Sequence, residues 1–263
     1  MGSATTQARE SLTSALRATS SITLDVAGEL FSVARTIGES SQLSGALADS
    51  AATASARQGV VAAVFGGSVS ATTVGLVDSA VAQRWSSASD LVDGIEELAV
   101  RAAAIAEPGA DVESELFQFS RTVAANPELE LALGSRLGEA SAKGALIERL
   151  LSGPASAATT TIVSALVRAP RERRVRQLLS RASQIVADQR GRTVATVVSA
   201  VPLQSAQADR LVAALSARYG TDVTLNTVVD PTVVGGLRVQ IADDVIDASV
   251  SARLADLRQR LAG

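Results

Sequence analysis

The residue types on which most enzyme mechanisms depend are scarce in this sequence. The 263 residues include no His and no Cys, and Lys143 is the one lysine. Thiol nucleophiles, disulfides, imidazole acid–base catalysis and zinc sites of the usual kind are therefore excluded. Glycines at 66–67 and 134–138 could suggest phosphate loops, but no Gly-Lys-Ser/Thr follows them, which favours helix breaks. We expect no catalytic residue, no cofactor and no metal site, and hence a protein that is not an enzyme.

Two pairs of adjacent carboxylates could be proposed as acid–base groups. They are Glu96-Glu97 and Asp243-Asp244. Adjacent side chains point in different directions on a helix or a strand, so neither pair is arranged to act on one substrate atom. We predict that the first pair lies on a solvated helix surface and the second in a turn.

Arginines crowd one loop and the start of a helix. The cluster, opposed there only by Glu172, comprises Arg168, Arg171, Arg173, Arg174, Arg176 and Arg181. A nucleic-acid reader combines such a patch with aromatic stacking residues, and this chain has only 4 Phe, 1 Trp and 1 Tyr. A net charge of −3 adds no overall attraction. We predict a solvated face or an acidic protein contact. The alternative function is a helical-repeat scaffold that binds nucleic acid or an acidic partner through this cluster.

The apolar residues indicate a chain that stays out of the membrane. The hydrophobic content of 47% is mostly Ala and Val spread through polar sequence. No stretch approaches the roughly 20 apolar residues that a membrane-spanning helix requires. Residues 1–10 lack the cationic start and apolar run of a secretory signal. We expect a cytoplasmic protein that reaches any membrane through a partner.

An internal repeat occupies the first two thirds of the chain, with an offset of 86 positions. Matched residues are Leu30-Phe31 with Leu116-Phe117, Arg35-Thr36 with Arg121-Thr122, and Val81 with Val167. Matched apolar residues recur at three- and four-residue steps, as in amphipathic helices that bury one face. We predict two tandem helical bundles, residues 1–106 and 107–188. Residues 89–106 also align with the first helix, 4–17, so whether they close one bundle or open the next is left open.

The ends of the expected helices also correspond between the two copies. Ser40 and Asn126 occupy the same place and are predicted as helix N-caps, and Pro127 suits the first turn that follows Asn126. Gly66-Gly67 and Gly153-Pro154 are predicted to mark the next break in each copy. Trp85 stands just past an apolar helix and is expected to pack over its end.

The pattern changes after residue 188, which predicts a third domain, residues 189–263. Short β-branched runs at 193–201, 223–229 and 237–241 predict strands. Ser205 is expected to cap a helix that ends at Tyr219, with Gly220 as its stop. A turn at 242–244 leads to Val245-Ile246, and Asp247 is expected to cap a final helix. The predicted class is thus mainly α, with a small α+β domain at the C-terminal end.

Apolar stripes on the two helices of this domain are candidates for partner contact. They comprise Leu211, Leu215, Val250, Leu254 and Leu257. A module of about 70 residues is marginally stable by itself, so contact with a partner would help it.

The order of motifs in the last third resembles the delta subunit of F-type ATP synthases, called the oligomycin-sensitivity-conferring protein in mitochondria. The signature residues, expected to be structural, are Asp230, Pro231, Gly235, Gly236 and Asp247. Ala242 and Ala248 depart from this pattern, because the family usually has Gly there. The duplicated helical part and the Arg-rich composition make the chain similar to an actinobacterial member with an enlarged N-terminal domain.

This resemblance implies a non-catalytic stator subunit. The helical part would bind the N-terminal helices of alpha subunits on the catalytic head, and the C-terminal module would bind the peripheral-stalk b subunit. One copy per complex is implied, with no direct nucleotide and no nucleic acid. The chain would lie at the cytoplasmic face of the cell membrane, reached only through the b subunit.

Overall fold

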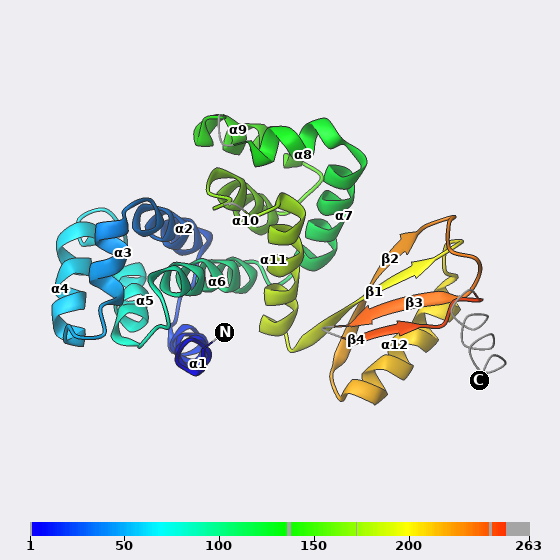
Figure 1. Cartoon of the computed structure of the whole chain (residues 1–263), viewed down its shortest axis with the longest axis horizontal. Coiled ribbons are helices and arrows are strands. Elements are labelled where there is room, and N and C mark those ends of the chain that lie inside the picture. The colour runs from blue at the N-terminus through cyan, green and yellow to red at the C-terminus, as the bar shows by residue number, and fades with distance from the viewer. Residues whose placement is uncertain (1, 136–137, 172, 242–243, 251–263) are drawn as a thin grey trace, which may run out of the picture. The chain divides into compact units, whose positions relative to one another are not determined.

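The computed structural model describes residues 2–135, 138–171, 173–241 and 244–250 (Figure 1). They form two compact units, Met1–Ile185 and Val186–Gly263. The first is helical and the second contains a small sheet, so the predicted class, mainly α with an α+β end, is confirmed. This grouping does not separate residues 1–106 from 107–188, and the division into three domains stays a prediction.

The helices before the sheet recur with the offset found in the sequence. They are α1 (Ser3–Ala18), α2 (Leu24–Glu39), α3 (Ser41–Ala48), α4 (Ala54–Phe65), α5 (Ala71–Ala82), α6 (Ala88–Ala106), α7 (Val112–Ala125), α8 (Pro127–Gly134), α9 (Ala140–Leu151), α10 (Ala157–Arg168) and α11 (Val175–Gln189). A shift of 86 positions carries α3, α4 and α5 onto α8, α9 and α10 with identical bounds. The same shift carries α2 onto α7.

Helix α6 belongs to both copies. The shift of 86 positions carries α1 onto residues 89–104, within α6, and carries α6 onto 174–192, over α11. α6 packs against α1, α2, α3 and α5 of the first copy and against α10 of the second. Figure 1 shows α6 between the blue-to-cyan helices and the green ones. The segment that the sequence left unassigned therefore closes one copy and opens the next.

A polar contact is repeated along with the apolar positions. In the first copy the Glu29 carboxylate accepts hydrogen bonds from the Ser70 backbone N–H (3.0 Å) and hydroxyl (2.7 Å). In the second copy Glu115 accepts the same two bonds from Ser156 (2.9 and 2.6 Å). Each serine is the N-cap of the following helix, α5 or α10. A carboxylate at this end of a helix accepts a hydrogen bond from a backbone N–H that has no partner within the helix, and its negative charge interacts favourably with the positive end of the helix dipole.

The predicted helix ends are confirmed at two places and wrong in detail at a third. The Ser40 hydroxyl accepts the Leu43 N–H (3.2 Å), and Gly153, just past α9, adopts a φ of 95°. Asn126 precedes α8 with Pro127 in the first turn, but its side chain does not cap that helix. The Asn126 amide instead donates to the Thr122 carbonyl (2.7 Å), because the last carbonyls of α7 lack partners in their own helix.

Trp85 packs over the end of α5, as predicted. Its indole N–H donates to the Ala80 carbonyl at 2.9 Å, and the side chain is buried. The ring lies where a side chain on Gly94 of α6 would be, so glycine is required for this approach.

The second unit is a four-stranded sheet with one helix along a face, as Figure 1 shows. The strands lie in the order β2-β1-β3-β4, and their bounds are β1 (Arg192–Ser199), β2 (Asp222–Val229), β3 (Leu237–Ile241) and β4 (Asp244–Asp247). β1 and β2 are parallel and are joined through α12 (Ser205–Tyr219), whereas β3 runs antiparallel to β1. Its core comprises Ala195, Val197, Leu215, Val223, Val239 and Ile241.

The expected strands and helix are found, with two corrections. Asp244, predicted in a turn, is the first residue of β4, and the helix start also differs. Gln204, not Ser205, is the N-cap of α12, since Gln204 and Gln207 form a reciprocal capping box. Gly220 ends the helix with a φ of 70°, as predicted.

Candidate partner-binding surfaces

The arginine cluster is held by carboxylates of the same unit. Arg171 bonds Asp93 (2.5 Å) and Glu96 (3.0 Å), and Arg173 makes two bonds to Glu96 (2.8 and 2.9 Å). These bonds tie the loop between α10 and α11 to α6. The prediction that Glu96 lies on a solvated surface is wrong, because its side chain is only 15% exposed.

Among the described residues, the remaining arginines of the cluster other than Arg174 are paired in the same way. The pairs are Arg168 with Glu148 (2.8 Å), Arg176 with Glu130 (3.0 Å) and Arg181 with Glu97 (3.2 Å). Paired guanidinium groups have little charge left to offer a polyanion. We predicted a face that is solvated or contacts an acidic partner; its arginines mainly contact acidic residues of the protein itself. The structure does not favour the nucleic-acid alternative.

Glu97 is the centre of this network. It is 9% exposed, so the prediction of a solvated carboxylate is wrong here too. It accepts hydrogen bonds from Arg101 (2.8 Å), one turn along α6, and from Arg181 of α11, and Arg9 of α1 lies 3.6 Å away. A buried carboxylate needs such partners, and these come from three helices that span both copies. The four-residue spacing of Glu97 and Arg101 could have indicated their ion pair from the sequence.

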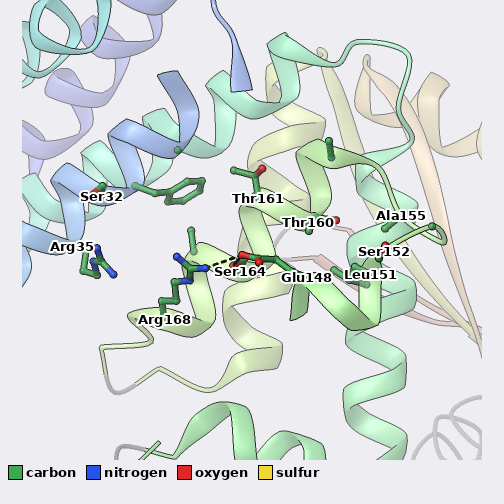
Figure 2. A pocket seen from close by; sticks show the side chains of 15 residues that line it. Ser32, Arg35, Glu148, Leu151, Ser152, Ala155, Thr160, Thr161, Ser164 and Arg168 are labelled. Carbon is green, nitrogen blue, oxygen red and sulfur yellow. Dashed lines mark hydrogen bonds and ion pairs between the residues drawn. The ribbon is translucent and has the colours of Figure 1, made fainter. Parts of the chain in front are cut away.

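A groove of about 630 Å³ lies between the two copies. Figure 2 shows its walls, with Ser32 and Arg35 on α2 of the first copy, and Thr160, Thr161, Ser164 and Arg168 on α10 of the second. Phe31 and Leu151 also line it, although each is largely buried. Sequence reasoning missed this groove, because its walls come from segments more than a hundred positions apart.

The signature residues Asp230 to Gly236 form a loop that is closed by hydrogen bonds. The Asp230 carboxylate accepts the Thr232 N–H (2.9 Å), and the Asp230 N–H donates to the Ser199 carbonyl (2.8 Å). Pro231 follows at the exposed turn. Gly235 and Gly236 have φ values of 66° and 82°, which favour glycine. These hydrogen bonds and glycine conformations hold the loop in one shape, and the structural role of its signature residues stays a prediction.

The glycines also hold the chain that follows β4. The Val250 N–H donates to the Gly235 carbonyl (3.1 Å), and the Ala248 N–H donates to the Leu237 carbonyl (2.9 Å). A Cβ on Gly236 would lie 2.5 Å from the Ala248 carbonyl oxygen. Close approach of the backbone after β4 thus explains Gly236, and Gly235 lies against the Val250 side chain.

Asp247 ends β4 instead of directly preceding a helix. Its carboxylate accepts the Ser249 N–H at 2.9 Å, and helical geometry is first seen at Val250. Hydrogen bonds from Ser249 lower the pKa of Asp247, with a smaller effect from Arg238. The predicted helix residues Leu254 and Leu257, and Asp243 of the predicted turn, lie outside the described residues.

Leu211 and Leu215 do not form the expected partner surface. Leu215 is 4% exposed and lies in the core between α12 and the sheet, and Leu211 packs against that core. The single apolar face of α12 packs against the sheet of the same unit. Val250 is 43% exposed and remains available for contact.

Exposed valines gather at one end of the sheet. Ser199, Val229 and Leu237 are neighbours there, because the ends of β1 and β2 meet the start of β3. The exposed residues at or just beyond this end are Val201, Val229, Val234 and Val250. We name them the valine end. Several exposed apolar side chains together indicate a binding surface more strongly than single ones do.

The described residues therefore define a class of protein with a duplicated helical scaffold and a small sheet module. Within the described ranges no cluster of His, Cys, Asp or Glu could hold a metal ion. No helix there is long and apolar enough to cross a membrane.

Comparison with known proteins identifies the family. The family model described as "ATP synthase delta (OSCP) subunit" matches residues 99–261. A protein of Leifsonia xyli called "ATP synthase subunit delta" is 49% identical over the whole of both chains. Another of that name, from Streptomyces avermitilis, is 41% identical over 98% of this chain and 96% of its own. The chain belongs to the ATP synthase delta (OSCP) subunit family.

A solved structure shows a weaker likeness. It is a chain of the Toxoplasma gondii mitochondrial ATP synthase hexamer, with a TM-score of 0.40 and 20% identity, over 64% of this chain and 97% of that one. The family model begins inside α6, so α1 to α5 precede the matched segment.

Proposed function

We propose that this chain is the stator adaptor of a proton-translocating ATP synthase, not an enzyme in its own right. Membership of the delta subunit family supports this most directly, through relatives that match over the full length. In this role the protein joins the catalytic head to the peripheral stalk and resists the torque of the rotor. One copy serves each complex, because a single stalk meets the head.

Each of the two units binds a different partner. The helical unit Met1–Ile185 binds the N-terminal segments of alpha subunits, and the sheet unit binds the membrane-anchored b subunit. The valine end is the contact surface of the sheet unit, since it exposes apolar side chains beside a loop held rigid by hydrogen bonds. Rigid apolar anchors suit an interface that must hold under load.

The internal ion pairs fit this mechanical role. Arg171, Arg173 and Arg181 bind carboxylates of α6, which both copies share. The two copies can therefore transmit force as one piece without a flexible linker. The protein lies at the cytoplasmic face of the membrane, held there through the b subunit.

A tagged chain tests this function. Purification from detergent-solubilised membranes should recover the alpha and b subunits together with the chain, at one chain per complex. Val234→Asp, at the valine end, should lose the b subunit and keep the head. Val64→Asp, an equally simple change at an exposed valine of the helical unit, is the control that should keep the b subunit. Recovery of neither partner by the unaltered chain would refute the proposal.

A further inference from the structure

The groove between the two copies is lined by hydrogen-bond donors that the fold does not use. Among the described residues, Arg35 has no carboxylate partner, and the hydroxyls of Ser32 and Thr161 make no hydrogen bond to the protein. Other helix hydroxyls do, since those of Thr36 and Thr122 donate to the carbonyl one turn back (3.0 and 3.1 Å). The three unused donors come from both copies, because Ser32 and Arg35 lie on α2 and Thr161 lies on α10 (Figure 2).

The charges of the groove favour a ligand with one negative group. The charged side chains among the described residues that line it are Arg35, Arg168 and Glu148. Arg168 and Glu148 pair with each other at 2.8 Å, so the unbalanced positive charge is that of Arg35. A guanidinium with hydroxyls on both sides of a groove suits a phosphate, because its three terminal oxygens accept hydrogen bonds in different directions.

The size and polarity of the groove indicate what carries the phosphate. Its volume of about 630 Å³ lies within the range of roughly 300–1,000 Å³ that is typical of small-molecule sites, and far exceeds a bare phosphate ion. The Glu148 carboxylate, with 54% of its side chain exposed, accepts hydrogen bonds and would repel a second negative group. Phe31 is only 8% exposed and offers no open face on which a nucleobase could stack. A monophosphate on a body rich in hydroxyls therefore fits better than a nucleotide.

We propose that the groove binds a sugar monophosphate, with the phosphate on Arg35, Ser32 and Thr161 and the sugar hydroxyls beside Glu148. This ligand contacts α2 of the first copy and α10 of the second, so its binding stabilises the junction of the two copies. The site is independent of the stator function, and its test needs only the full-length chain.

Calorimetric titration of the purified chain tests the class of ligand. The probes are glucose 6-phosphate, ribose 5-phosphate, glucose and ADP. At least one of the two sugar phosphates should bind at one molecule per chain with a Kd below about 1 mM, and more tightly than glucose or ADP. No saturable binding of either sugar phosphate, or binding of glucose or ADP that is equally tight, would overturn the proposal.

An arginine substitution in each copy tests the location of the site. Arg35→Gln removes the unpaired charge and should weaken binding of the sugar phosphate about tenfold or more, because hydrogen bonds to charged groups are strong. Arg121→Gln makes the same change at the equivalent position on α7, which does not line the groove, and should leave the affinity within about twofold. Equal affinities in the two variants would refute the location.

A second pair of variants fills the space without a change of charge. Gly28 on α2 lines the groove, and Gly75 on α5 does not. A side chain at either position meets nothing within 4 Å, and leucine favours a helix more than glycine does, so both leucine variants should fold at least as stably as the unaltered chain. Gly28→Leu should abolish binding of the sugar phosphate, whereas Gly75→Leu should not change it. A folded Gly28→Leu chain with unaltered affinity would overturn the proposal.

Discussion

Gly236 is predicted to hold the end of the sheet unit in place through a close backbone contact. The test compares Gly236→Ala with Gly220→Ala in the same unit. Their φ values are 82° and 70°, so both alanines adopt an unfavourable left-handed conformation at a cost of about 1–2 kcal/mol. A Cβ at Gly220 meets nothing within 4 Å, whereas one at Gly236 lies 2.5 Å from the Ala248 oxygen and 2.8 Å from the Ser249 Cα.

The extra cost at Gly236 follows from what must move. Displacement of residues 248–250 weakens the Ala248–Leu237 and Val250–Gly235 backbone hydrogen bonds, at about 1 kcal/mol each. Gly236→Ala should therefore destabilise the sheet unit by about 3–4 kcal/mol, roughly twice the effect of Gly220→Ala. Gly236→Val, with a bulkier side chain, should disrupt the unit further and weaken binding of the b subunit.

Urea unfolding followed by hydrogen exchange in peptides from β1 and β3 reports on the sheet unit. Fluorescence of Trp85, the single tryptophan, reports on the helical unit and should not change. Equal destabilisation by Gly236→Ala and Gly220→Ala would show that backbone conformation alone matters there, and would refute the role given to the close contact.

Three further substitutions test the packing of the helical unit. Burial raises the pKa of Glu29, but hydrogen bonds from Thr73 and Ser70 outweigh it and lower the pKa below 4.5. The ionised Glu29 carboxylate therefore stabilises the folded state above pH 4.5. This stabilisation is lost as the pH falls through the lower pKa that Glu29 has in the folded protein. Glu29→Gln should cost about 1–2 kcal/mol at pH 7 and flatten this part of the stability profile; an unaltered profile would contradict the contact. Gly94→Val should displace Trp85, cost about 1–3 kcal/mol and shift its emission to the red, whereas Gly109→Val, at an open position, should leave the emission unchanged. Glu97→Gln should lower the free energy of chemical unfolding by about 3–5 kcal/mol. The exposed control Glu39→Gln should lower it by less than about 0.5 kcal/mol. Similar losses of stability in the two variants would count against a buried network.

Local patterns predicted the helices and strands because the chemistry that ends each element lies within a few residues of it. The repeat was visible because equivalent helices recur at one spacing, and even the glutamate–serine contact follows that spacing. Ser40 and Gly220 behave as short-range rules expect. Asn126 does not, because a side chain between two helices can satisfy either the carbonyls behind it or the amides ahead of it.

Long-range pairing could not be predicted in this way. The partners of Arg171 and Arg173 lie on α6, 75 to 78 positions earlier. The local sequence contains few carboxylates near the cluster, so it predicted an exposed face. The same pairing explains why Glu96 and Glu97 are sheltered. The apolar face of α12 suited a partner as well as a sheet, and only the fold shows that Leu215 is in the core. The groove required the placement of α2 against α10.

The central claim is that this chain links the catalytic head to the stalk. Sedimentation of purified head, full-length chain and the soluble part of the b subunit measures this link directly. The account predicts that all three sediment together at one chain per head, and that the head and the b subunit separate when the chain is omitted. Association of the head with the b subunit that is equally strong without the chain, or no three-part complex at all, would contradict it.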